Sequence, residues 1–267
     1  TVGTPSTATG TILNDDFPSV AVSSVTVAEG NSGTTNAVFT VDLSAPATAS
    51  GVTFDIATFN GTATAGSDYV ANSQVGMVIP AGATSASFTV LVNGDTLNEA
   101  DETFFVRITN VVGAFVNGSQ GTGTMTNDDP LPVLSINSLS IVEGDVGTRI
   151  MNFLLTLDTP SGRAVSVNVA TANGTATAGS DYVAATGGFS FAPGETSKTF
   201  PGQVIGDTSP EADETFTVTM SGVTNATLGA NPGTGTIVND DVPLDIQPAN
   251  LPSGTVGVLY SAILTTD

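Results

Sequence analysis

The stretch Asn60-Gly-Thr-Ala-Thr-Ala-Gly-Ser-Asp-Tyr-Val70 occurs twice in this 267-residue chain, the second time unchanged as Asn173–Val183. Glu99-Ala-Asp-Glu-Thr-Phe104 likewise returns unchanged as Glu211–Phe216. The copies lie 112 or 113 residues apart. A constant period of this size indicates tandem copies of one domain, and the period is close to the ~100 residues of an immunoglobulin-like sandwich.

A second motif, Asn-Asp-Asp, punctuates the chain and predicts where the repeats end. It begins at Asn14, Asn127 and Asn239, and each time a proline follows within two residues. We expect four segments: the terminal strand of a preceding repeat over 1–17, a first repeat over 18–130, a second over 131–243, and the start of a further Ig-like domain over 244–267. The last segment is expected because residues 251–264 are similar to the opening of Ig-like repeats in bacterial surface proteins.

Within the first repeat, apolar and polar residues alternate in short runs separated by Gly, Asn, Asp and Pro, the pattern of half-buried strands. Seven strands are predicted there: 20–27, 37–43, 52–58, 75–79, 86–92, 103–109 and 121–126. The fold class is therefore all-β, as tandem Ig-like antiparallel β-sandwiches of about seven strands each. In the second repeat Pro201 falls within a strand, and since proline cannot donate to a ladder, that strand should be an edge or bulged at this point.

The composition excludes several classes of function. Four basic residues stand against 25 acidic ones, for a net charge of −21, so nucleic acid and anionic membranes are poor partners. No apolar run reaches the ~18 residues of a membrane helix, so no membrane insertion is expected. The chain has no Cys, His or Trp, which removes disulfides, thiol chemistry and the commonest general base. Because the same acidic clusters recur in each repeat, we expect no enzyme.

The candidate chemistry is carboxylate chemistry. Sixteen of the 25 acidic residues occupy repeated motif positions, seven in each repeat plus Asp15 and Asp16. Those of the repeats are Glu29, Asp68, Asp95, Glu99, Glu102, Asp128 and Asp129, and then Glu143, Asp181, Asp207, Glu211, Glu214, Asp240 and Asp241. Loops of a sandwich meet at its two ends, and clustered carboxylates repel one another unless a cation intervenes. Ca²⁺, which takes six to eight oxygens in irregular geometry, suits such a cluster; the alternative is that these are ordinary solvated turn residues.

These motifs resemble the Calx-beta domain, in Gly66-Ser-Asp-Tyr69, Glu99–Phe104 and Asn127–Asp129. The resemblance covers both repeats and implies an Ig-like sandwich that gathers Ca²⁺ at the end where the last strand leaves. It implies ligands at all fourteen carboxylates above, and at the main-chain carbonyls of Leu97 and Ser209. The family's strongest binders carry Asp where this chain has Asn127 and Asn239, so fewer ions or weaker affinity are expected here.

We expect a calcium-stiffened spacer or adhesive stalk in a secreted or surface-anchored bacterial repeat protein, whose partners are neighbouring repeats. Two alternatives stay open. One is an adhesin module in which a repeat face binds a surface carbohydrate or protein ligand, which an exposed aromatic cluster would favour. The other is a non-catalytic accessory segment of a large extracellular enzyme.

Overall fold

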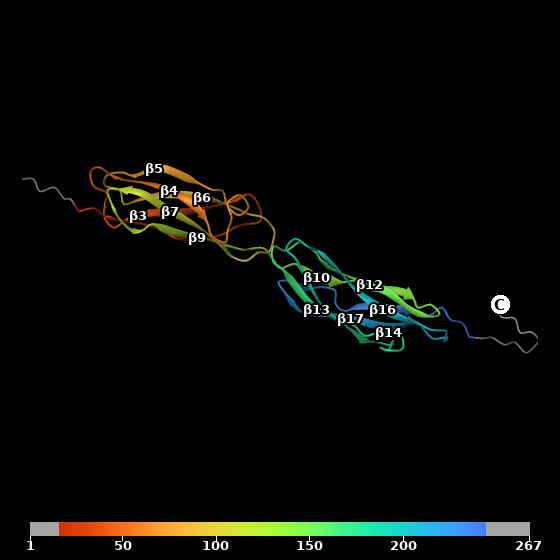
Figure 1. Cartoon of the computed structure of the whole chain (residues 1–267). Helices are drawn as coiled ribbons and strands as arrows, with labels where there is room; N and C mark the ends of the chain where they lie inside the picture. The colour runs from red at the N-terminus through yellow and green to blue at the C-terminus, as the bar shows by residue number, and fades with distance from the viewer. Residues whose placement is uncertain (1–15, 244–267) are drawn as a thin grey trace, which may run out of the picture. The chain divides into compact units, whose positions relative to one another are not determined.

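The computed structural model describes residues 16–243, which form two compact units divided between Pro130 and Leu131. Each unit is a sandwich of two sheets whose strands run between its two ends (Figure 1). No helix occurs in residues 16–243, so none there is long and apolar enough to cross a membrane. The predicted terminal strand of a preceding repeat (1–17) and the predicted further domain (244–267) lie outside these residues, apart from Asp16 and Phe17.

The first unit has nine strands. They are β1 (Ser19–Val22), β2 (Val25–Ala28), β3 (Thr34–Leu43), β4 (Val52–Asn60), β5 (Ser73–Ile79), β6 (Ser85–Asn93), β7 (Glu102–Val112), β8 (Phe115–Gly118) and β9 (Gln120–Thr126). One sheet has the order β6-β3-β1-β8 and the other β2-β9-β7-β4-β5. The all-β tandem sandwich predicted from the alternation is confirmed.

The second unit repeats the arrangement with ten strands. They are β10 (Val133–Ile136), β11 (Leu139–Val142), β12 (Gly147–Leu157), β13 (Val165–Asn173), β14 (Tyr182–Val183), β15 (Thr186–Phe191), β16 (Ser197–Gly206), β17 (Glu214–Thr224), β18 (Thr227–Leu228) and β19 (Gly233–Val238). Their sheets have the orders β14-β16-β12-β10-β18 and β11-β19-β17-β13-β15.

The predicted opening strand 20–27 was wrong in one respect, because it is two strands in different sheets. β1 pairs with β3, whereas β2 pairs with β9 in the opposite sheet. The change of sheet falls at Ser23 and Ser24, whose hydroxyl groups accept hydrogen bonds from the amides of Thr40 and Thr122. Each serine thus satisfies a backbone donor where the ladder is interrupted.

Strand β8 was not predicted at all, while the expectation for Pro201 was met. β8 is a four-residue edge strand with largely exposed side chains, so it carries no alternating signal. Pro201 lies opposite Asn152 in the continuous β12–β16 ladder, and β14 covers β16 only at Gln203 and Val204. At Pro201 the strand therefore has a neighbour on one side only, where a missing N–H costs no ladder bond.

An aromatic group fills the core of each unit near one end. Tyr69 stacks on Phe104 with ring centroids 4.6 Å apart, and Phe39 meets Phe104 edge to face at 5.7 Å. Tyr182, Phe216 and Phe153 repeat this arrangement at 4.5 and 5.9 Å. All six rings are almost completely buried. Such pairs contribute about 0.5–1.5 kcal/mol each beyond burial.

The ring of Phe104 leaves no room for a side chain at the opposing strand position. Gly123 pairs with Phe104 in the ladder, and a Cβ added there would lie 2.4 Å from Cζ of the ring. We expect Gly123→Ala to lower the free energy of unfolding by about 1–3 kcal/mol through overpacking, measured by denaturant titration. Gly188→Ala is the matched control, since its added Cβ meets nothing nearer than 3.7 Å; equal losses in the two variants would contradict the packing argument.

Candidate metal centre

The parallel pairing of β2 with β9 brings together residues that lie about a hundred positions apart. Val25–Ala28 align with Gly123–Thr126 in register, so both strands end at the same end of the unit. Glu29 directly follows β2, and Asn127, Asp128 and Asp129 directly follow β9. The Glu29 amide donates to the Thr126 carbonyl at 3.2 Å and the Gly30 amide to Oδ1 of Asp128 at 3.0 Å.

We call Glu29, Asp128 and Asp129 the exit cluster. One carboxylate oxygen from each lies within 4.8 Å of the other two. Glu29 and Asp129 are each only 6% exposed. The backbone after β9 is fixed from two sides, because the side-chain amides of Asn98 and Asn127 both donate to the Asp129 carbonyl, at 2.8 and 3.0 Å.

Beside it lies a second group, which we call the turn cluster: Asp68, Glu99 and Glu102. Asp68 and Glu102 share a side-chain hydrogen bond. The pKa of Glu99 is raised by burial and then by the charges of Asp95, Asp68 and Asp129, so Glu99 lies near all three. Glu99 is thus the member of the turn cluster on which Asp129 of the exit cluster acts. Its amide is held by Oδ1 of Asn127 at 2.9 Å.

The unchanged block 60–70 explains why Asp68 is available at this place. Oδ1 of Asn60 accepts hydrogen bonds from the Tyr69 hydroxyl at 2.7 Å and from the Ala65 amide at 2.9 Å. Oδ2 of Asp68 accepts the Thr64 amide at 2.6 Å. Tyr69 stacks in the core on Phe104, so the block ties the turn to the aromatic group. Asn173, Asp181 and Tyr182 make the same bonds in the second unit, at 2.6 to 3.0 Å.

The second unit builds both clusters again. Its exit cluster is Glu143, Asp240 and Asp241, and its turn cluster is Asp181, Glu211 and Glu214; in each, the three carboxylates meet within 4.8 Å. β11 and β19 supply the same parallel pairing, and the Gly144 amide donates to Oδ1 of Asp240 at 3.0 Å. Glu143 is 5% exposed.

The electrostatics of the clusters are unfavourable without a cation. Burial, followed by repulsion from neighbouring carboxylates, raises the pKa of Glu29 and of Glu143 to about 7. Burial and Asp68 raise the pKa of Glu102 to about 7. Burial also raises the pKa of Glu99, Asp129, Glu214 and Asp241. Nearby charges of the same sign and loss of water both disfavour the ionised form.

Among the described residues no basic side chain forms an ion pair with either cluster, although Arg149 lies beside Gly144 and donates to the Val142 carbonyl at 2.8 Å. The one ion pair among residues 16–243 joins Lys198 to Glu195 at 2.6 Å. Meanwhile Oε1 of Glu29 and Oδ2 of Asp129 and of Asp241 are buried without a hydrogen-bond partner. Buried polar atoms in folded proteins are normally satisfied. Orphaned anionic oxygens that converge on one place fit a hard divalent ion with oxygen ligands, and their number and irregular placement fit Ca²⁺ better than octahedral Mg²⁺.

The structure places the remaining predicted ligands in a turn at the same end of each unit. Oδ1 of Asp95 accepts the Leu97 amide at 2.7 Å, and Asp207 does the same for Ser209 at 2.7 Å. Asp95 raises the pKa of Glu29, and Asp207 that of Glu143, so both lie near an exit cluster. The predicted ligand roles of the Leu97 and Ser209 carbonyls stay predictions.

Three residues of these surroundings were missed by the sequence reasoning. Asp101 and Asp213 accept the amides of Asn127 and Asn239, at 3.1 and 3.2 Å, and so hold the start of each exit segment. Their place in the repeated Glu-Ala-Asp-Glu motif was an available signal. Asp145 is, after burial, the main cause of the raised pKa of Asp241. It stands where the first repeat has Asn31, so the repeat comparison could not reveal it.

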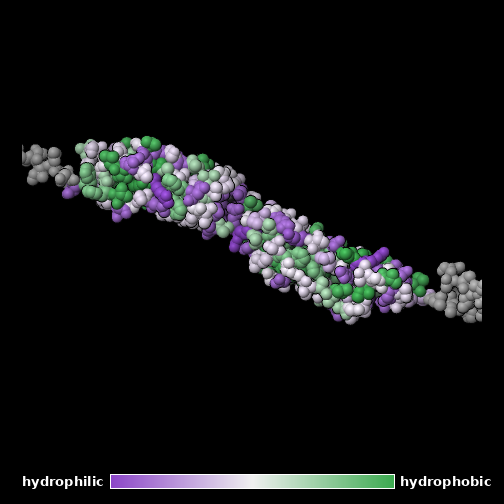
Figure 2. All heavy atoms as spheres, viewed as in Figure 1, coloured by the Kyte–Doolittle hydropathy of each residue, from purple (hydrophilic) through white to green (hydrophobic). Residues whose placement is uncertain are grey.

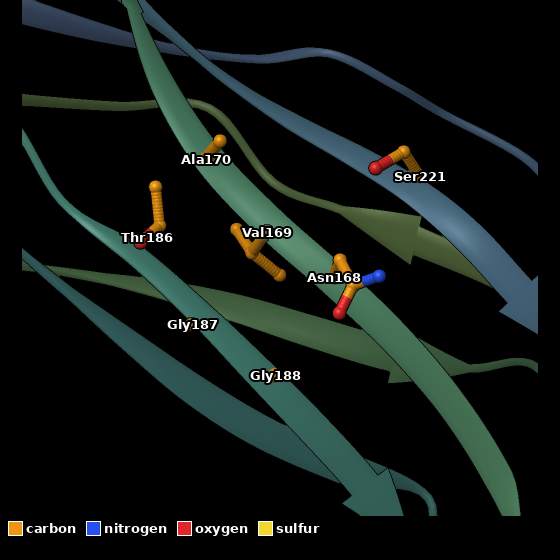
Figure 3. A pocket seen from close by; sticks show the side chains of 7 residues that line it. All are labelled: Asn168, Val169, Ala170, Thr186, Gly187, Gly188 and Ser221. Carbon is orange, nitrogen blue, oxygen red and sulfur yellow. The ribbon is translucent and has the colours of Figure 1, made fainter.

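A separate hollow in the second unit carries no such chemistry. Figure 3 shows it on the face of β13 and β15, lined by Asn168, Val169, Ala170, Thr186, Gly187, Gly188 and Ser221. Its lining contains no carboxylate and no basic side chain, and two of its residues are glycines of the edge strand β15. The clusters at the ends of the strands remain the candidate site.

The fold and these clusters define a class of tandem β-sandwich repeats with a candidate cation site at the ends of the strands. A profile of the Calx-beta domain matches residues 13–130 and 132–241, and the chain belongs to that family. It is 30% identical over 195 residues, 70% of its length, to the zebrafish (Danio rerio) Adhesion G-protein coupled receptor V1, and 27% identical over 161 residues, 57% of its length, to Extracellular matrix protein 3 of Lytechinus variegatus. The chain spans only 3% and 5% of those two proteins. Among solved structures, CBD12 from CALX1.2 matches 77% of this chain and 80% of its own, with 22% identity and a TM-score of 0.38.

The raised pKa values predict an unusual pH dependence. Glu29, Glu102 and Glu143 each have a higher pKa in the folded state than in the unfolded chain. Their contribution to the free energy of unfolding is therefore fully present below pH ~4.5 and is lost as the pH rises through about 7. Each pKa unit corresponds to about 1.4 kcal/mol. In chelator the melting temperature should therefore fall from pH 5 to pH 8. Hydrogen bonds lower the pKa of Asp55 and Glu195, which titrate below this window.

The stabilisation by Ca²⁺ should increase with pH, because the ion binds the ionised carboxylates and competes with protons. The gain in melting temperature on adding Ca²⁺ should be largest at pH 8 and smallest at pH 5. Calorimetric scans at both pH values, with Ca²⁺ and with chelator, check this. A metal-free melting temperature that rises between pH 5 and pH 8 would rule out buried, mutually repelling carboxylates.

Proposed function

We propose that this chain is a calcium-binding structural segment of a large secreted or cell-surface repeat protein, in which ions at the exit of each repeat stiffen the joint to the next. The observation that carries the proposal is the exit cluster, which holds buried carboxylate oxygens without partners next to the turn cluster in both units. Bound Ca²⁺ would neutralise charge that the described residues leave uncompensated.

Chain connectivity supports an effect on the joint. Asp129 is followed by Pro130, Leu131 and Pro132, and β10 begins at Val133. The carbonyl of Asp129, held by Asn98 and Asn127, is thus separated from the next sandwich by three residues, two of them prolines with a fixed φ. An ion that fixes Asp128 and Asp129 also fixes the start of that connection.

An extracellular place is supported by the two curated relatives, a cell-surface receptor and a matrix protein. The absence of cysteine supports an array stabilised by metal in place of disulfides, as we propose for a bacterial surface protein. Neighbouring repeats are the proposed partners.

A second candidate function, an adhesin module, is favoured by one surface feature of the first unit. The guanidinium of Arg107 lies 4.8 Å from the centroid of the Phe59 ring and 5.9 Å from that of Phe105, on the outer face of β4 and β7. Phe59 is 42% exposed. Arg107 is the one basic residue of repeat 18–130. Figure 2 shows that exposed hydrophobic residues form separate patches in each unit in this view. Loss of glycan or cell binding in Phe59→Ala would support this candidate.

Calcium should raise the melting temperature of the chain well above its value in chelator, and Mg²⁺ should do so much less. An ion that binds only the folded state adds RT ln(1 + [L]/Kd), about 2.7 kcal/mol at a hundredfold excess over Kd. Differential scanning calorimetry at matched ionic strength measures the shift. Superimposable curves in Ca²⁺ and in chelator would refute the proposed ion binding.

Replacing Asp128 and Asp129 together by Ala should weaken Ca²⁺ binding and widen the range of angles between the repeats. The strand content should hardly change, since the apolar alternation is untouched. Isothermal titration calorimetry gives the affinity, circular dichroism the strand content, and small-angle scattering in saturating Ca²⁺ the loss of extension. Asp42→Asn is a charge control on an exposed strand position. A double variant as extended and as tight in binding as the parent would identify these residues as ordinary turn carboxylates.

A further inference from the structure

The entry and the exit of the first unit lie at opposite ends of its strands. The chain enters beside Ser19, whose carbonyl accepts the Ser44 amide just after the end of β3. It leaves after Thr126, next to Gly30, near the start of β3 at Thr34. Since β3 runs the length of the sheet, tension on the two ends of the unit acts along the strands.

The strands that receive this tension are parallel and adjacent. β2 aligns with β9 from Val25–Gly123 to Ala28–Thr126, and β11 aligns with β19 from Leu139–Gly235 to Val142–Val238. Tension on the entering chain acts first on β1, which pairs with β3 and β8, and through Ser23 and Ser24 on the start of β2. Since β9 is pulled from its end, β2 and β9 are drawn in opposite directions along a shared ladder. All bonds of the ladder are then loaded together in shear, whereas an antiparallel pair pulled from one end opens one bond at a time.

The carboxylate cluster lies across the same two strands. Glu29 is the residue after β2, Asp128 and Asp129 come after β9, and the Gly30 amide already donates to Asp128 at 3.0 Å. An ion held by Glu29 and Asp129 would join the two strands at the end where β9 is pulled. The orphaned oxygens Oε1 of Glu29 and Oδ2 of Asp129 point to such an ion.

We propose that each repeat is a force-bearing module in which the parallel ladder between its entry and exit strands resists tension in shear, and Ca²⁺ bound across that ladder raises the resistance. The ladder part stands on topology alone. The calcium part rests on the proposed function.

Single-molecule pulling on the whole chain tests both parts. Handles at the two termini load the ladders in shear. A variant carrying Asp42→Cys and Ser85→Cys loads the antiparallel β3–β6 pair from one end, because these residues are ladder partners and both are exposed. The chain has no other cysteine, so the handles attach at these two sites alone. In chelator we expect the terminal geometry to need clearly more force than the Asp42–Ser85 geometry at the same loading rate.

Calcium should act on the terminal geometry through the exit cluster. At a Ca²⁺ concentration about a hundred times Kd, the unfolding rate at fixed force should fall by up to about a hundredfold if the ion is lost before the ladder breaks. Asp129→Asn should abolish this slowing for the first repeat, so that the variant unfolds at the same rate with Ca²⁺ as it does in chelator. Asp42→Asn, with the same loss of charge in the same repeat, should retain the slowing.

The outcomes separate the two claims. Equal forces in the two pulling geometries would overturn the shear ladder. Ca²⁺ that raises the melting temperature but leaves the rate under terminal load unchanged would overturn the calcium clamp and leave the proposed ion binding standing. Ca²⁺ without effect in either experiment would remove the proposed function together with the clamp, and the geometry comparison would still decide the ladder.

Discussion

The parallel pairing of the entry and exit strands is the constraint on which each unit depends. Gly30 and Asp128 are 98 positions apart in the sequence, and the alignment of β2 with β9 brings them close enough for the Gly30 amide to donate to Asp128 at 3.0 Å. The pairing requires the opening strand to change sheets at Ser23 and Ser24. The hydroxyl groups of these two serines, which accept the Thr40 and Thr122 amides, therefore help to position the carboxylates.

The carboxylate clusters destabilise the folded state of each unit, and packing elsewhere in the sandwich compensates for this. Burial and repulsion raise the pKa of Glu29 to about 7, so the ionised cluster opposes folding. The opposing contribution comes from the aromatic group, because Tyr69 stacks on Phe104 and ties the turn that bears Asp68 to the core. Within block 60–70, Asn60 binds the Tyr69 hydroxyl and the Ala65 amide, and Asp68 binds the Thr64 amide, so these polar residues fix the turn that carries the Asp68 carboxylate.

The sequence was sufficient for the fold class and for most of the cluster, and its failures have physical reasons. Alternation reports burial, so it revealed the strands with one buried face and missed β8, whose side chains are exposed. The apolar positions also change phase across Ser23 and Ser24, from Val20 and Val22 to Val25 and Val27, so the break between β1 and β2 left a signal that a single predicted strand ignored. Repeat comparison found residues that both copies share. It was blind to Asp145, which has a neutral counterpart in Asn31, although its charge acts on Asp241.

Residues that differ between the repeats matter because the two clusters have equivalent carboxylates but different surroundings. In the first repeat the side chain of Asn98 is buried and donates to the Asp129 carbonyl; the second repeat has Pro210 there, which has no side-chain donor. Asp129 is buried, while Asp241 is partly exposed and lies near an additional carboxylate, Asp145. The first site is therefore more enclosed and its backbone more firmly held. The second has an additional carboxylate, Asp145, and also an additional guanidinium, Arg149, where the first repeat has Thr35. Enclosure favours a preorganised site. The motif thus specifies which carboxylates meet, and the residues around it, which vary between the repeats, set how enclosed each cluster is and which charges surround it.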